Sequence, residues 1–178
     1  GRARRLMRSY ARLQATQSAT SVIKADLEAN EALPISIDTV SSYITALKRL
    51  FVIEDLPAWC PNLRCKTPIR TGDTRYYVDP SVATAALGLG PDDLINDLTT
   101  YGLLFETMAV RDLRVYMDAL FGSVSHYLDA SGLECDAVVH MRNGKYGLIE
   151  IKLGGTEWIA KGGATLKKLA ERIETVKM

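Results

Sequence analysis

One hairpin constrains the fold of this chain more than any other stretch, and it lies in residues 132–154, GLECDAVVHMRNGKYGLIEIKLG. Two runs of strand-forming residues flank a tight turn, and the turn allows two registers. A two-residue type I′ turn at Asn143-Gly144 would place Asp136 and Glu150 on opposite faces. A three-residue loop with Gly144 in the left-handed conformation would instead place Asp136 directly across from Glu150.

The composition of the two strands favours the three-residue loop. That register gathers an almost wholly apolar set on one face and leaves Glu134, Asp136, Glu150 and Lys152 on the other. Two acids that face each other across a strand pair repel unless a cation lies between them. Hard oxygen ligands at this spacing suit Mg²⁺ or Mn²⁺, with Lys152 placed to steady a developing charge or to orient water.

A third carboxylate, Glu106, lies in the helical pattern LLFETMAV, on the same stripe as Leu103, Val110 and Leu113. A partly buried carboxylate on such a stripe needs a partner. Glu106 could complete a metal site with the hairpin acids. The alternative is a buried Glu106–Lys152 ion pair without a metal.

The first 60 residues predict three helices followed by a short strand. The helices are expected over residues 4–15, in TSVIKADLEAN, and after Ser36 as N-cap, and LFVIEDL then has strand composition. This is the order of a winged helix-turn-helix. Its third helix would present the DNA-binding candidates, which are Thr39, Ser42, Thr45, Lys48 and Arg49. The alternative, which the sequence favours equally, is that the small helical domain mediates protein contacts or packs on a neighbour.

The remaining chain predicts a mixture of helices and strands. RYYV predicts a strand stopped by Asp79-Pro80, then a short helix ending at Gly88. Residues 91–122 predict one long helix or a pair, and residues 123–153 predict three strands. The last segment, TEWIAKGGATLKKLAERIETVKM, begins with a Gly-rich stretch and ends as a helix.

Bulk properties exclude several classes of protein. The net charge of +1 over 178 residues gives no global basic field, and no apolar run reaches the length of a membrane span. The three cysteines, Cys60, Cys65 and Cys135, lack the spacing of a zinc site. They are expected to be free thiols, which fits a cytoplasmic protein without membrane attachment.

Asp136 followed by E-x-K at 150–152, with Glu106 on an earlier helix, resembles the PD-(D/E)xK restriction-endonuclease-like superfamily. More closely, the chain resembles the C-terminal region of bacterial and archaeal AAA-type ATPases. The likeness lies in YITALKRLFVIEDLPAW, RYYVDPSVATAALG, GLLFETMAVRDLRVY, SGLECDAVV and GLIEIKLGG. It implies a winged helix over 1–60, a connector over 61–74 and a nuclease-like mixed sheet flanked by helices over 75–178.

The resemblance also implies roles for the candidate residues. Asp136, Glu150 and Glu106 would hold Mg²⁺ or Mn²⁺, and Lys152 would assist catalysis on DNA. The partner ATPase module would lie upstream in the same polypeptide. No GxxxxGK[ST] motif for a nucleotide occurs here, so this chain is expected to have no ATP site and no ATPase activity. The leading hypothesis is metal-dependent hydrolysis of DNA phosphodiesters, and an oligomer is compatible with it. The alternative is a non-catalytic DNA-binding or regulatory module of the parent ATPase.

Overall fold

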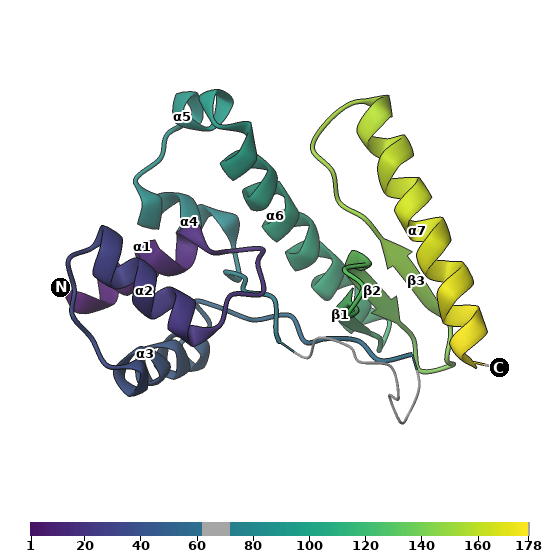
Figure 1. The fold of residues 1–178 in the computed structure, drawn as a ribbon, viewed down its shortest axis with the longest axis horizontal. Helices are drawn as coiled ribbons and strands as arrows, with labels where there is room; N and C mark the ends of the chain where they lie inside the picture. The colour runs from purple at the N-terminus through teal and green to yellow at the C-terminus, as the bar shows by residue number, and fades with distance from the viewer. Residues whose placement is uncertain (62–71, 178) are drawn as a thin grey trace. The chain divides into compact units, whose positions relative to one another are not determined.

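The computed structural model describes residues 1–61 and 72–177 and shows an α+β fold (Figure 1). The described residues form seven helices and one three-stranded antiparallel sheet. Both strand pairs are antiparallel, so the prediction of a mixed sheet is wrong for the described residues. The helices are α1 (Arg2–Arg12), α2 (Thr20–Asn30), α3 (Ile37–Arg49), α4 (Pro80–Leu87), α5 (Pro91–Asn96), α6 (Leu98–Ala119) and α7 (Thr156–Lys177), and the strands are β1 (Ser123–Leu128), β2 (Glu134–His140) and β3 (Tyr146–Ile149). No helix in the described ranges is both long enough and apolar enough to cross a membrane.

The chain divides into two compact units. Among the described residues, the first comprises 1–55 and 72–108, and the second comprises 56–61 and 109–177. This division differs from the predicted one at 61–74, because α4 packs on α1 and so joins residues after 72 to the first unit. The boundary falls within α6. Most of the predicted connector, including its basic residues and Cys65, lies outside the described residues.

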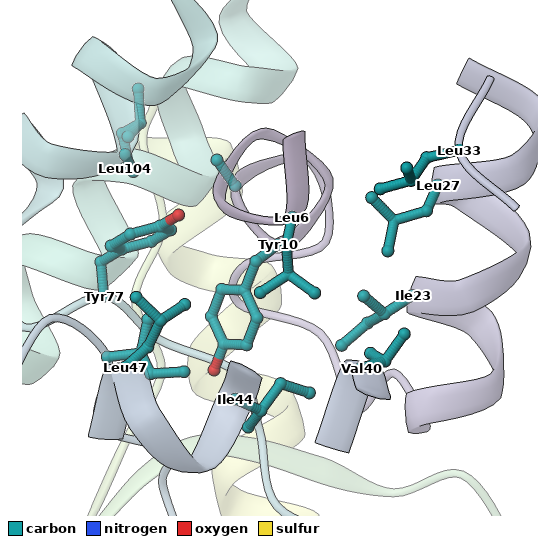
Figure 2. Packing of buried hydrophobic residues seen from close by; sticks show 13 residues of the cluster. Leu6, Tyr10, Ile23, Leu27, Leu33, Val40, Ile44, Leu47, Tyr77 and Leu104 are labelled. Carbon is teal, nitrogen blue, oxygen red and sulfur yellow. The ribbon is translucent and has the colours of Figure 1, made fainter. Parts of the chain in front are cut away.

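The first unit is built around one apolar core (Figure 2). Leu6 and Tyr10 of α1, Ile23 and Leu27 of α2, and Val40, Ile44 and Leu47 of α3 are its main buried side chains. Tyr77 packs edge-on against Tyr10, with the ring centroids 5.5 Å apart. The predicted N-cap is confirmed, since the Ser36 hydroxyl accepts a hydrogen bond from the Thr39 amide at 3.2 Å.

The β part of the predicted winged helix is much reduced. The predicted strands LFVIEDL and RYYV meet only in a single antiparallel bridge between Ile53 and Tyr77. The amide of Glu54 donates to the Tyr76 carbonyl at 2.9 Å, and pairing extends little further. Phe51, with a positive φ of 53°, lies two residues before the bridge, and Pro80 begins α4 three residues after it. Of the predicted winged helix, the described residues therefore show the three helices and one short strand contact, and they show no wing hairpin.

The hairpin of the second unit has the register that places the two acids across from each other. Ala137 pairs with Ile149 and His140 with Tyr146. The Met141 amide donates to the Lys145 carbonyl at 2.8 Å, and Gly144 adopts a φ of 82°. The predicted three-residue loop is therefore confirmed and the two-residue turn is wrong.

Helix α7 packs against β2 and β3 of this sheet (Figure 1). Leu169 and Ile173 of α7 are fully buried in one cluster with Val138 of β2. The segment predicted as a Gly-rich stretch is helical from Thr156 onward, so Gly162 and Gly163 lie inside α7. Glycine disfavours a helix by only about 1 kcal/mol, and the apolar face of α7 outweighs that cost.

Two of the three cysteines lie in the described residues. Cys135 is a free thiol, and its burial raises its pKa to about 12. Cys60 is disulfide-bonded, so the expectation of a free thiol is wrong at that position. A disulfide at Cys60 therefore does not support the predicted cytoplasmic location, where thiols are kept reduced.

Candidate active site at the end of the hairpin

Asp136, Glu150 and Lys152 come together where the β2–β3 ladder ends. The Lys152 ammonium lies 2.8 Å from Glu150 Oε1 and 3.4 Å from Asp136 Oδ2. The Ile151 amide donates a hydrogen bond of 2.6 Å to Asp136 Oδ2. The structure thus brings together three of the four predicted catalytic residues.

Local backbone geometry explains this convergence. The ladder described for β2 and β3 stops at the pair Ala137–Ile149, and Glu150 follows it directly. Beyond Ile149 the Ile151 amide donates its hydrogen bond to the Asp136 carboxylate. A side-chain oxygen thus replaces a backbone carbonyl as the acceptor. Side chains alternate along a strand, so Asp136 lies on the same face as Val138, which α7 covers.

Glu150 is a buried acid with one open oxygen, a carboxylate oxygen that accepts no hydrogen bond from the described residues. Its side chain is only 8% exposed. Its Oε2 atom is buried and has no hydrogen-bond partner among the described residues. Burial raises the pKa of Glu150, the charge of Asp136 raises it further, and the Lys152 hydrogen bond opposes both. A buried carboxylate oxygen without a partner is costly and is typical of a site that binds a ligand.

Lys152 is held as a cation by the two acids. Partial burial acts to lower the pKa of Lys152, but the hydrogen bond to Glu150 and the charge of Asp136 raise it overall. The ammonium therefore stays charged at neutral pH. It balances part of the negative charge that the two carboxylates place at the hairpin end.

A pocket of about 360 Å³ opens beside this cluster. Its walls are residues 132–134 at the start of β2, the chain after β3 and residues 158–168 of α7. The lining residues are Gly132, Leu133, Glu134, Glu150, Lys152, Trp158, Lys161, Gly162, Thr165 and Lys168. The pocket therefore lies between the buried Glu150 and a face of α7 that carries two cationic side chains, Lys161 and Lys168.

Gly162 allows α7 to approach Glu150 closely. A Cβ atom at this position would lie 3.1 Å from Glu150 Cγ and 3.8 Å from Lys152 Cγ. Such a contact is tighter than most that Cβ atoms make, so a side chain here would push against the acid. The neighbouring Gly163 has open space around the equivalent position.

Glu106 belongs to the first unit, whereas the hairpin acids belong to the second. It lies in α6 and accepts a hydrogen bond of 2.5 Å from the Tyr76 hydroxyl. Its role beside Asp136 and Glu150 stays a prediction. Within the described ranges, no three His, Cys, Asp or Glu side chains are grouped so that they could hold a metal ion.

The predicted DNA-binding residues lie on α3, and most already have partners. The Ser42 and Thr45 hydroxyls donate to carbonyls one turn back, at 2.9 and 3.0 Å. The Lys48 ammonium pairs with Asp55 at 2.8 Å. Thr39 is half-buried and Arg49 is exposed. The helix face is thus less basic than its sequence indicates, and DNA binding by α3 stays a prediction.

The α7 wall of the pocket was not predicted from the sequence. Trp158, Lys161, Thr165 and Lys168 recur at spacings of three and four residues, which places them on one side of a helix. That pattern could have been found. It was hidden because the adjacent glycines indicated a Gly-rich stretch before the helix.

Comparison with known proteins concerns mainly the first unit. Residues 1–93 match the family described as a domain of unknown function, DUF8612. The chain belongs to this family. The match ends within α5, so the hairpin and α7 lie outside it. No curated protein and no solved structure matches the chain.

Proposed function

We propose that the second unit is a nuclease-like domain of the PD-(D/E)xK kind that hydrolyses a phosphodiester bond of DNA. One observation carries the proposal. Glu150 is buried with an open oxygen in the same cluster as Asp136 and Lys152. Perturbed, partly unpaired ionisable groups that line a pocket are characteristic of functional sites.

The donor set fits a divalent cation held by few protein ligands. Mg²⁺ commonly takes only one or two carboxylates and completes its shell with water and substrate phosphate. Asp136 and Glu150 would be these ligands, and Glu106 would be a third if the two units bring it there. When bound, Mg²⁺ or Mn²⁺ would supply an activated water and neutralise phosphate charge.

The residues of this chain have distinct roles in this proposal. The Ile151 amide fixes the orientation of the Asp136 carboxylate. Glu150 presents its open oxygen beside Asp136. Lys152 stabilises the negative charge that develops on the phosphate. Its present contacts with both acids keep the ammonium at the reacting position.

A non-catalytic module is the second candidate, and one observation favours it. Lys152 already pairs with both carboxylates, so the cluster can persist as an ionic triad without a metal. In that case the unit would bind DNA or regulate an ATPase module of the same polypeptide. The order of α1, α2 and α3 in the first unit, which is that of a winged helix without its wing hairpin, is compatible with either function.

The test is a cleavage assay on plasmid and single-stranded DNA with Mg²⁺ or Mn²⁺. Wild type is compared with Asp136→Asn and Lys152→Met, and folding is checked by circular dichroism. Cutting by wild type alone supports the nuclease. Binding of Mn²⁺, followed by its electron paramagnetic resonance, should weaken in Asp136→Asn. Folded protein that neither cuts DNA nor binds Mn²⁺ would favour the non-catalytic module.

A further inference from the structure

We propose that the pocket between α7 and the hairpin end binds single-stranded nucleic acid, with phosphates on Lys161 and Lys168 and an unpaired base on Trp158. This inference rests on the proposed function and deepens it by naming an unpaired strand as the substrate. Trp158, Lys161 and Lys168, on which it depends, lie on α7 and are not members of the Asp136–Glu150–Lys152 cluster.

The α7 wall provides the cations that a phosphate backbone needs. Lys161 and Lys168 are both exposed and line the pocket with Thr165, whose hydroxyl donates to the Lys161 carbonyl at 3.3 Å. Lysine ammonium groups and hydroxyls are common partners of backbone phosphates in protein–nucleic acid complexes. No ion pair with an acid is found for either lysine in the described part of the chain. Both are therefore available to a phosphate.

Trp158 provides an aromatic surface at the mouth of the same pocket. Its side chain is 53% exposed, although it is large and apolar. Gly154 packs so closely against it that a Cβ there would lie 2.6 Å from Trp158 Cδ1. The Lys161 ammonium lies over the ring, 5.3 Å from its centroid. A base could replace this ammonium on the ring while Lys161 moves to a phosphate.

An aromatic side chain beside the cationic wall of this pocket favours the binding of single strands over duplexes. Unpaired bases stack on exposed aromatic side chains, whereas bases inside a duplex already stack on one another. The pocket volume of about 360 Å³ suits a small ligand group such as one nucleotide. Because Glu150 and Lys152 line the same pocket, a strand on α7 would bring a phosphate to the candidate active site.

The decisive measurement uses the whole chain in EDTA, so that binding is observed without cleavage. A labelled oligothymidylate and a duplex of equal length are titrated, and fluorescence anisotropy is recorded. Wild type should bind the single strand at least about tenfold more tightly than the duplex. Tryptophan emission should be quenched through Trp158, since the other tryptophan, Trp59, is buried in the core.

Variants locate the binding surface. Trp158→Ala should weaken single-strand affinity at least about fivefold, which is the lower end for the loss of one stacked base. Lys161→Ala with Lys168→Ala should reduce the dependence of affinity on salt by about 1.4 in log–log slope, since each lysine contributes about 0.7. Lys167→Ala is the matched control, because Lys167 is exposed on α7 but does not line the pocket.

The outcomes separate this inference from the nuclease proposal. Single-strand binding that depends on Trp158, Lys161 and Lys168, without cleavage in Mg²⁺, would support binding in this pocket and contradict the nuclease proposal. Cleavage that is unaffected by these substitutions would support the nuclease proposal and overturn single-strand binding in the pocket. Equal affinity for duplex and single strand would also overturn single-strand binding in the pocket. So would an effect of Lys167→Ala as large as that of the Lys161→Ala and Lys168→Ala substitutions.

Discussion

Each unit of the molecule buries carboxylates, and Asp55 of the first unit and Glu150 of the second are satisfied very differently. Asp55 of the first unit is 1% exposed, and its Oδ2 accepts from Arg75 at 2.5 Å and from Lys48 at 2.8 Å. Its Oδ1 accepts from the Tyr10 hydroxyl. Glu150 of the second unit pairs through Oε1 with Lys152, while Oε2 has no hydrogen-bond partner among the described residues.

This difference distinguishes a structural acid from a candidate functional one. A buried charge with every acceptor position paired helps to fix one packing arrangement, and it offers nothing to a ligand. A buried charge with an open oxygen costs folding energy, and proteins retain such costs mainly at functional sites. Substitutions at the two positions should therefore have opposite consequences for stability and for activity.

The largest effect on stability is expected from Asp55→Asn. The change leaves the buried end of Arg75 without its charged partner and also removes the partner of Lys48. Breaking one side of a buried ion pair costs about 3–5 kcal/mol. Urea unfolding measures this loss, and Asp38→Asn, at an exposed site in the first turn of α3, should cost under about 1 kcal/mol. Equal small losses would contradict a structural role for Asp55.

A second paired acid of the first unit, Asp26, should make stability depend on pH. Burial acts to raise the pKa of Asp26, but hydrogen bonds from Arg12, the shortest 2.6 Å, lower it overall. A depressed pKa means that the stabilisation is present above the ordinary Asp value of about 4 and is lost as the pH falls through the folded value. Asp26→Asn should cost about 1.5–3 kcal/mol at neutral pH.

The same variant tests the sign of this dependence. Unfolding free energies measured between pH 7 and pH 2.5 should converge for wild type and Asp26→Asn at the acidic end. Parallel curves for the two proteins would show that the Arg12–Asp26 contact contributes no proton linkage.

Glu150→Gln should behave in the opposite way to Asp55→Asn. Glutamine removes the repulsion from Asp136 and the cost of burying a charge, although it weakens the Lys152 pair. We expect the unfolding free energy to change by less than about 1 kcal/mol. Cleavage of DNA, if the proposed function holds, should fall at least about hundredfold. Glu134→Gln, at an exposed position of the same pocket, is the matched control.

A loss near 3 kcal/mol in Glu150→Gln would place Glu150 with Asp55 as a structural acid. It would also remove the contrast between the two units on which the proposed function depends.

The sequence predicted the hairpin register because only one register separates the polar residues from the apolar ones. Asp136 and Glu150 lie seven residues on either side of Asn143, so their pairing followed from the local choice of turn. The partners of Glu106 depend on contacts between distant segments, and no local pattern predicts them. The helical state of Gly162 and Gly163 was also missed, since burial of Leu169 and Ile173 further along α7 outweighs their intrinsic preference.

The smallest expected effect compares these two adjacent glycines. Alanine stabilises a helix interior by about 1 kcal/mol relative to glycine, and Gly163 has open space around the added methyl group. Gly163→Ala should therefore raise stability by about that amount and leave cleavage unchanged. In Gly162→Ala the methyl would lie 3.1 Å from Glu150 Cγ, so Glu150 must move by a few tenths of an ångström.

Gly162→Ala should thus lose most of the helix stabilisation and reduce cleavage several-fold. Thermal unfolding and the cleavage assay, run on both variants, measure the two effects separately. If Gly162→Ala matches Gly163→Ala in both measurements, the close approach of α7 does not control the position of Glu150. A difference confined to cleavage would show that Gly162 is there for the site, because a helix that needed only to cover the sheet would gain stability from alanine at either position.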